Sequence, residues 1–146
     1  VKYEQGVDAF NQGKFKVFNQ AQESPYIGFD TRVEIKQVKD ANTGETLLAY
    51  KIFDLNGEKV LYGFKCKPSQ PVEIIINGRD INREAKGVGQ NGFNGGNLKI
   101  IVDPSVTESY ILTYDTRGSK GQKGTAGNGK PGVDGTVEIV KQKVTW

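Results

Sequence analysis

The chain of 146 residues contains no histidine, no methionine and a single cysteine. Without histidine it lacks the base of Ser-His-Asp triads and Cys-His pairs, and it lacks the commonest protein ligand of zinc. A lone Cys66 excludes an internal disulfide, and its place at the end of the alternating apolar stretch 61–66 is typical of a small buried hydrophobe. These absences favour a non-enzymatic protein with no catalytic residues, no metal site and no cofactor.

Apolar residues are also scarce, at 36% of the chain. No apolar run approaches the roughly 18 residues that span a bilayer, so we expect no transmembrane segment. The 20 basic and 17 acidic residues are interspersed, which predicts a solvated surface and argues against a nucleic-acid partner. Because position 1 is not methionine and no signal peptide is visible, we expect a processed or excised chain.

Glycine, by contrast, is abundant: 19 residues, about twice the usual share. Ten of them recur at every third position in three series, and we expect these to be structural. They are Gly89, Gly92 and Gly95; Gly118, Gly121, Gly124 and Gly127; and Gly129, Gly132 and Gly135.

A glycine at every third position leaves one edge of a polyproline II helix bare, and such a helix has no internal hydrogen bonds. Its N–H and C=O groups must therefore bond to water or to neighbouring segments. Three outcomes fit the pattern: extended segments of one chain packed side by side, glycine-rich surface loops, or a collagen-like trimer. The trimer is the least favoured, because only Lys130-Pro131-Gly132 places a proline before a glycine.

Most of the remaining chain has the period of two that is typical of strands. We predict an all-β fold with an antiparallel meander or sandwich over residues 31–86, whose strands lie near 31–38, 46–54, 59–65 and 72–76. A glycine-rich β region with period-three segments packed as extended polyproline-II-like helices follows over 87–146, with strands near 98–102, 110–114 and 137–144. Residues 1–30 form a third region, the N-terminal aromatic segment.

The N-terminal segment has apolar residues at helical spacing, so a short helix followed by a strand at 14–18 is expected there. Residues 6–15 also resemble the middle of a tetratricopeptide repeat, which would imply a helical hairpin.

The glycine-rich part resembles known families. The order Gly89–Ser105, then Tyr-Ile-Leu-Thr-Tyr at 110–114, then repeated Gly-x-x, is similar to glycine-rich segments in exported and surface proteins of Bacteroidota-like bacteria. It is also similar to the polyglycine-II bundles of phage adhesins. This resemblance implies a secreted or cell-surface protein with a scaffold or binding role.

Two sets of side chains are candidate contact residues. The first is a basic cluster among the glycines, which could meet an anionic polymer: Arg117, Lys120, Lys123 and Lys130. The second is a group of aromatic residues that pack in the core or dock onto a partner: Tyr3, Phe10, Phe15, Phe18, Tyr26 and Phe29.

The sequence therefore predicts a non-enzymatic, secreted or cell-surface module for adhesion or assembly, bound to a protein, to a polysaccharide or to itself. An accessory domain of a larger enzyme or secretion machine is the first alternative. A hydrolase that uses a pair of carboxylates is the second.

Overall fold

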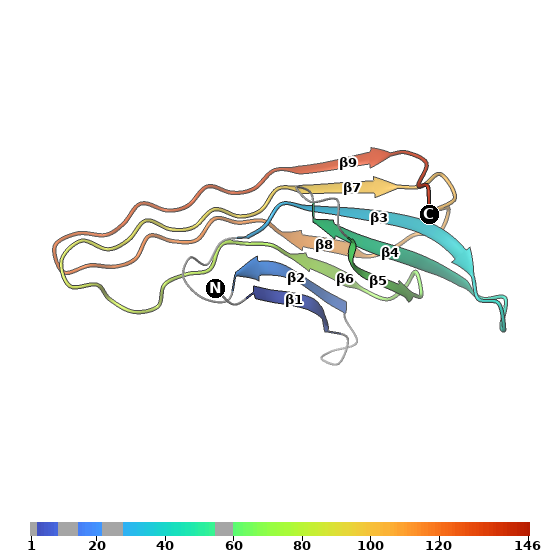
Figure 1. Ribbon diagram of the computed structural model, residues 1–146, viewed down its shortest axis with the longest axis horizontal. Helices are drawn as coiled ribbons and strands as arrows, with labels where there is room; N and C mark the ends of the chain where they lie inside the picture. Colours follow the sequence, from blue (N-terminus) through green and yellow to red (C-terminus); the bar gives the residue numbers. More distant parts are fainter. Residues whose placement is uncertain (1–2, 9–14, 22–27, 55–59) are drawn as a thin grey trace.

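The computed structural model describes residues 3–8, 15–21, 28–54 and 60–146, and it contains two β-sheets in that part of the chain. The strands are β1 (Tyr3–Asp8), β2 (Phe15–Ala21), β3 (Thr31–Lys39), β4 (Thr46–Asp54), β5 (Val60–Cys66), β6 (Val72–Ile75), β7 (Leu98–Val102), β8 (Leu112–Asp115) and β9 (Val137–Lys141). The all-β prediction is confirmed. Figure 1 shows the two sheets stacked on one another and a long arm that leaves them at one end.

The larger sheet has the order β5-β4-β3-β7-β9. Strands β5, β4 and β3 pair antiparallel, whereas β7 pairs parallel with both β3 and β9. In β3, Val33 and Ile35 are fully buried and alternate with Arg32, Glu34 and Lys36 on the other face. This alternation with period two gives the sheet one apolar face toward the core and one charged outer face.

The smaller sheet has the order β1-β2-β6-β8. Its antiparallel pair β1–β2 is followed by two parallel pairs, β2–β6 and β6–β8. Val72 and Ile74 of β6 are fully buried, as is Val17 of β2. They pack with residues of β3, β4 and β7 in one hydrophobic core between the sheets. Strands from all three regions of the sequence therefore contribute to a single sandwich.

The helix expected near the N-terminus is wrong for the described residues, because Tyr3–Asp8 is strand β1 and pairs with β2 along its whole length. An isolated short helix is marginal in water, so pairing with a ready sheet edge outweighs helical spacing. Of residues 6–15, which resemble a tetratricopeptide repeat, 6–8 and 15 lie in strands, and 9–14 lie outside the described residues. The expected strand at 14–18 is confirmed as the first part of β2. Phe10 and Tyr26 lie outside the described residues.

The meander is right for β3, β4 and β5 but wrong for the strand at 72–76. That strand, β6, crosses to the smaller sheet and lies between β2 and β8. Pro68 and Pro71 bracket the connection. Proline has no N–H to give to a ladder, so this stretch does not continue the hairpin with β5.

The arm consists of four extended segments that continue the strands beyond the sandwich (Figure 1). We call it the glycine arm and define it as residues 77–97 and 116–136. The chain runs outward along 77–86 after β6 and returns along 87–97 into β7. It then runs outward along 116–124 after β8 and returns along 125–136 into β9.

Candidate functional site

Lateral hydrogen bonds hold three segments of the glycine arm together in a ring. N–H groups of Gly89, Gly92 and Gly95 donate to carbonyls on 125–136, at 3.0, 2.7 and 3.0 Å. Those of Gly129, Gly132 and Gly135 donate to 116–124, at 2.9, 2.8 and 2.7 Å. The ring closes because Ser119 and Gln122 donate to the 87–97 segment, each at 2.8 Å. Hydrogen bonds within one chain thus join the period-three segments side by side.

The same ring explains why the inner residues are glycines. A Cβ built on Gly95 would lie 1.8 Å from the carbonyl oxygen of Thr116, and one on Gly121 would lie 1.8 Å from that of Gly129. One on Gly129 would lie 1.8 Å from that of Gln90. For nine of the ten predicted structural glycines, a built Cβ would lie 1.8–2.4 Å from a backbone oxygen of another residue. They are Gly89, Gly92, Gly95, Gly118, Gly121, Gly124, Gly129, Gly132 and Gly135. Gly127 differs, since it has open space and a φ of 153°.

A second period-three series escaped the sequence analysis. Asn91, Asn94 and Asn97 accept the backbone N–H of Lys130, Val133 and Thr136 at 2.9 Å each through Oδ1. The residue after each asparagine donates its own N–H to the carbonyl of that same partner, as Gly92 does to Lys130. We call this series the asparagine ladder. The repeated Asn-Gly or Asn-x step at three-residue spacing was the signal that could have revealed it.

Proline fits only one of the three positions in each three-residue repeat of this arrangement. On the 125–136 segment, N–H groups at 129, 132 and 135 bond to one neighbour and those at 130, 133 and 136 bond to the ladder. Pro131 occupies the third phase, so its missing N–H interrupts neither series.

The 116–124 segment has three distinct edges. Glycines form the inner edge, and the second edge carries Ser119 and Gln122, both almost completely buried. Ser119 Oγ accepts the Phe93 N–H at 2.6 Å, and Gln122 bonds to Gln90 N at 2.9 Å and to Arg83 O at 2.9 Å. The third edge is exposed and carries Arg117, Lys120 and Lys123. Period-three spacing thus turns these three cations to one side.

The four predicted basic contact residues do not all have the same surroundings. Lys120 and Lys123 line a shallow depression of about 340 Å³ together with Asp80, Arg83 and Glu84 of the first outgoing segment. Asp80 joins the first outgoing segment to the 116–124 segment, since its Oδ1 accepts the Lys120 N–H at 2.8 Å.

Arg117 forms a two-pronged ion pair with Asp115, with Nε–Oδ1 and Nη2–Oδ2 both at 2.9 Å. This pair lowers the pKa of Asp115 and raises that of Arg117. Lys130 is exposed on the neighbouring return segment. Of the four predicted contact residues, three therefore lie outside this pair, and we call them the cationic edge: Lys120, Lys123 and Lys130.

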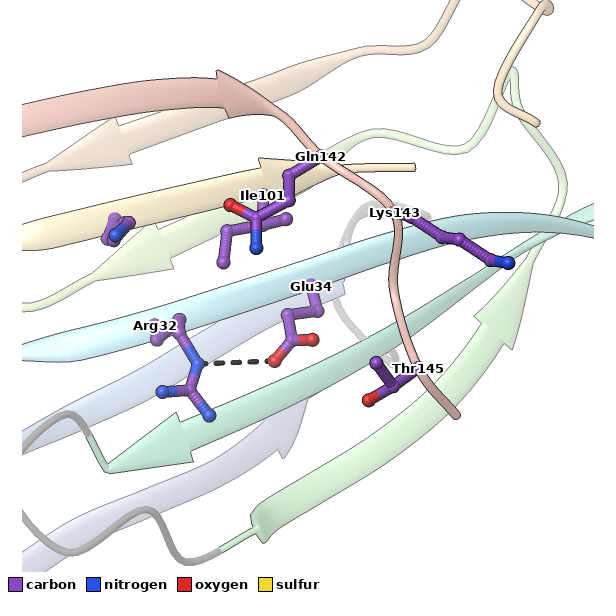
Figure 2. A pocket seen from close by; sticks show the side chains of 7 residues that line it. Arg32, Glu34, Ile101, Gln142, Lys143 and Thr145 are labelled. Atoms are coloured by element: carbon purple, nitrogen blue, oxygen red, sulfur yellow. Dashed lines mark hydrogen bonds and ion pairs between the residues drawn. The ribbon is translucent and has the colours of Figure 1, made fainter. Parts of the chain in front are cut away.

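A second depression, of about 330 Å³, lies on the outer face of the larger sheet. Figure 2 shows Arg32 and Glu34 of β3 and Ile101 of β7 beside the C-terminal segment, which carries Gln142, Lys143 and Thr145. Arg32 Nε donates to Glu34 Oε2 at 3.1 Å, and the guanidinium lies 4.4 Å from the centre of the Phe53 ring. Because Arg32 and Glu34 are already paired with each other, we assign no ligand to this depression.

Residues 142–146 form a strap across that outer face. Asp103 anchors it by accepting the Val144 N–H at 2.8 Å through Oδ2. This hydrogen bond and those from Ser105 lower the pKa of Asp103 to about 2. At the other end Trp146 packs under the ammonium groups of Lys36 and Lys51, 4.4 and 4.6 Å from its ring centre. Lys36 Nζ also donates to the Trp146 carbonyl.

The predicted aromatic docking surface is only partly described. Tyr3 and Phe15 lie in β1 and β2, while Phe18 and Phe29 are half-buried. Phe29 belongs to the base of the arm, where its backbone closely approaches Gly96 and its carbonyl accepts the Thr31 hydroxyl at 2.8 Å. Phe10 and Tyr26 lie outside the described residues.

The described residues offer little to the hydrolase alternative. A general acid of that kind needs a carboxyl group with a raised pKa. Where the pKa of a described carboxyl group shifts, it shifts downward: Asp40, Asp103 and Asp115. Glu34 and Glu45 are paired with Arg32 and Lys67, at 3.1 and 3.5 Å. Cys66 is buried and free, and burial raises the pKa of its thiol to about 11.

Comparison of the chain with protein-family models, with curated proteins and with solved structures gave no match. Within the described residues, no helix has the length and apolar character to cross a membrane. The same residues hold no group of three or more cysteine, aspartate or glutamate side chains placed to bind a metal ion.

Proposed function

We propose that this protein is a non-enzymatic structural and binding module of a secreted or cell-surface assembly. In this proposal the sandwich is the base, and the glycine arm is a stiff extension that holds a row of side chains away from it. The period-three hydrogen bonds support a polyglycine-II-like bundle, in which each segment takes an extended polyproline-II-like form.

One observation carries the proposal: inside the ring of three segments, the inner glycines face only backbone. Each inner glycine leaves room for a neighbour's carbonyl at a distance where a Cβ could not fit. The side chains of the arm lie outside this ring: Ser119 and Gln122 are buried against neighbouring segments, whereas Lys120, Lys123 and Lys130 are exposed. Because backbone hydrogen bonds and close packing fix three segments at once, the arm resists bending more than a glycine-rich loop would.

The closed ring also argues against a collagen-like trimer. The inward glycines are already used within one chain, and the outward positions carry lysine, valine, proline and aspartate side chains. Three arms could not approach as closely as collagen chains do, because only glycine fits at such an axis.

We assign the cationic edge to contact with an anionic polymer, and an acidic polysaccharide of a cell surface is the partner that we favour. Lys120, Lys123 and Lys130 are exposed on a stiff support, so little backbone entropy is lost when they bind. The arm has no exposed aromatic row between these lysines that would stack on bases, which disfavours single-stranded nucleic acid.

Binding to polygalacturonate tests this assignment, with its fully methyl-esterified form as the neutral probe. We expect the chain to bind the acidic polymer at low salt and to release it at about 0.5 M salt, because salt screens the charges. It should not bind the neutral ester. The double variant Lys120→Gln/Lys123→Gln should bind at least fivefold more weakly. The control Lys39→Gln/Lys65→Gln removes two exposed charges from the sandwich and should bind normally. Equal loss in both double variants would show that net charge, and not the edge, is responsible.

A further inference from the structure

The two sheets end on the same side in edge strands, β8 and β9, and no further described strand closes this side of the sandwich. Each strand is the last of its sheet in the described residues. At the base of the arm the two come together, because Gly135 N donates to Thr116 O at 2.7 Å and Thr116 Oγ1 donates to Gly135 O at 3.2 Å. Beyond that point β8 and β9 belong to different sheets.

The register shows which side chains of these edges face the core. Tyr114 of β8 pairs with Ile74, and Ile139 of β9 pairs with Ile100. Ile74 and Ile100 are fully buried between the sheets, so Tyr114 and Ile139 lie on the same inward faces. Yet Tyr114 is 44% exposed and Ile139 is 58% exposed. Large apolar residues on the inward face of a sandwich are normally covered, and no element in the described part of the chain covers these two.

The third inward position of β9 is Lys141, which pairs with the buried Val102. An inward charge on an edge strand discourages unselective strand pairing. Here it also sets a requirement: a strand that covers Ile139 brings a side chain opposite Lys141, and an acidic one complements it.

We propose that the β8/β9 edge binds an extended segment of another protein by strand addition. The segment pairs with the free edge of β9, places an apolar residue against Ile139 and next to Tyr114, and places an acidic residue two positions away against Lys141. Main-chain hydrogen bonds supply affinity in this mode, and alternate side chains supply specificity.

Two observations select an extended segment of another protein over a globular partner or a second copy. Tyr114 and Ile139 together expose on the order of 200 Å², far below the about 800 Å² per partner of a standard interface. In a symmetric antiparallel pairing of two β9 strands, Lys141 would face Val137 or Ile139, so no acidic residue would meet it. This inference does not depend on the function of the arm.

The probe is a seven-residue capped peptide of alternating threonine and valine with aspartate in place of the last valine. Amide chemical shifts and hydrogen exchange of the labelled full chain report where it binds. We expect saturable binding, with new protection confined to the amides of β9. Absence of saturable binding, or protection at β1, β5 or β8 instead, would overturn the proposal.

Ile139→Lys should weaken the peptide at least tenfold, and Ile139→Thr should weaken it without adding a charge. Val133→Lys is the matched control, since Val133 is 69% exposed on the arm and the same change there should have no effect. Lys141→Glu should reverse the preference between the aspartate peptide and one with lysine at that place. Equal affinity of wild type and both Ile139 variants would refute the site. If the chain forms a concentration-dependent dimer that Ile139→Lys abolishes, a second copy of the chain and not another protein occupies this edge.

Discussion

Replacement of Gly121 by alanine tests whether the inside of the glycine arm is as closely packed as the structure shows. The new Cβ would lie 1.8 Å from the carbonyl oxygen of Gly129 and 2.3 Å from its carbon. Both are backbone atoms, so no side chain can move aside. The 116–124 and 125–136 segments must therefore separate.

The expected cost follows from what that separation disrupts. Gly129 and Gly132 donate to the facing segment at 2.9 and 2.8 Å on either side of the substituted residue. Two lost hydrogen bonds cost about 1 kcal/mol each, and overpacking costs about 1–3 kcal/mol. The arm should open more easily by about 3 kcal/mol, which is on the order of 100-fold in the population of the open form.

Trypsin measures this population, because the bonds after Lys120 and Lys123 lie in the arm and are cleaved only when it opens. We expect Gly121→Ala to raise the cleavage rate at these two bonds by on the order of 100-fold, or up to the rate of the unfolded chain. Gly63→Ala is the control, since its Cβ would lie 3.7 Å from the nearest oxygen and would fit. An unchanged rate in Gly121→Ala would refute the closed interior.

Three further predictions concern single side chains. Asn94→Ala removes the acceptor of the Val133 N–H and should make the arm open about fivefold more often, whereas Asn94→Asp, which keeps an acceptor, should not; the same trypsin assay decides. Asp103 has a pKa of about 2 in the folded chain, below its usual value of about 3.9. The hydrogen bonds of the Asp103 carboxylate to the strap are therefore fully formed above about pH 4 and are lost as the pH falls toward 2. The fluorescence of Trp146 should change over the same pH range, and the Asp103→Asn variant should not show this change. Cys66 should react with Ellman's reagent at pH 8 only after denaturation, because the thiol is buried and its pKa is raised to about 11; rapid reaction of the native chain would contradict this.

Local patterns were sufficient to predict much of the fold. The alternation in 46–54 and 59–65 gave the antiparallel pair β4–β5. The glycine spacing predicted either lateral bonding between segments or solvated loops, because backbone without internal hydrogen bonds must bond to neighbouring segments or to water.

Long-range pairing could not be read in the same way. The residues of Val72–Ile75 do not reveal that this strand pairs with β2 and β8 and not with β5. Parallel partners are far apart in the sequence, so no local pattern marks them. Tyr3–Asp8 has helical spacing but pairs with β2, since a sheet partner decides the structure of so short a segment.

The candidate site was foreseen only in part. The period-three spacing of Arg117, Lys120 and Lys123 was visible, but the ion pair that occupies Arg117 involves Asp115, which belongs to a strand. The asparagine ladder follows the same spacing as the glycines and was readable in principle. The open edge at Tyr114 and Ile139 depends on which sheet each strand joins, so only the structure reveals it.

Amide hydrogen exchange along the 125–136 segment tests the central claim most directly. The account predicts a period of three: slow exchange at Gly129, Gly132 and Gly135 and at Lys130, Val133 and Thr136, as slow as in β7, with fast exchange at Asn128 and Asp134 in the phase of Pro131. Exchange of all these amides at the rate of an unfolded chain would contradict it, and would leave glycine-rich loops on a β-sandwich.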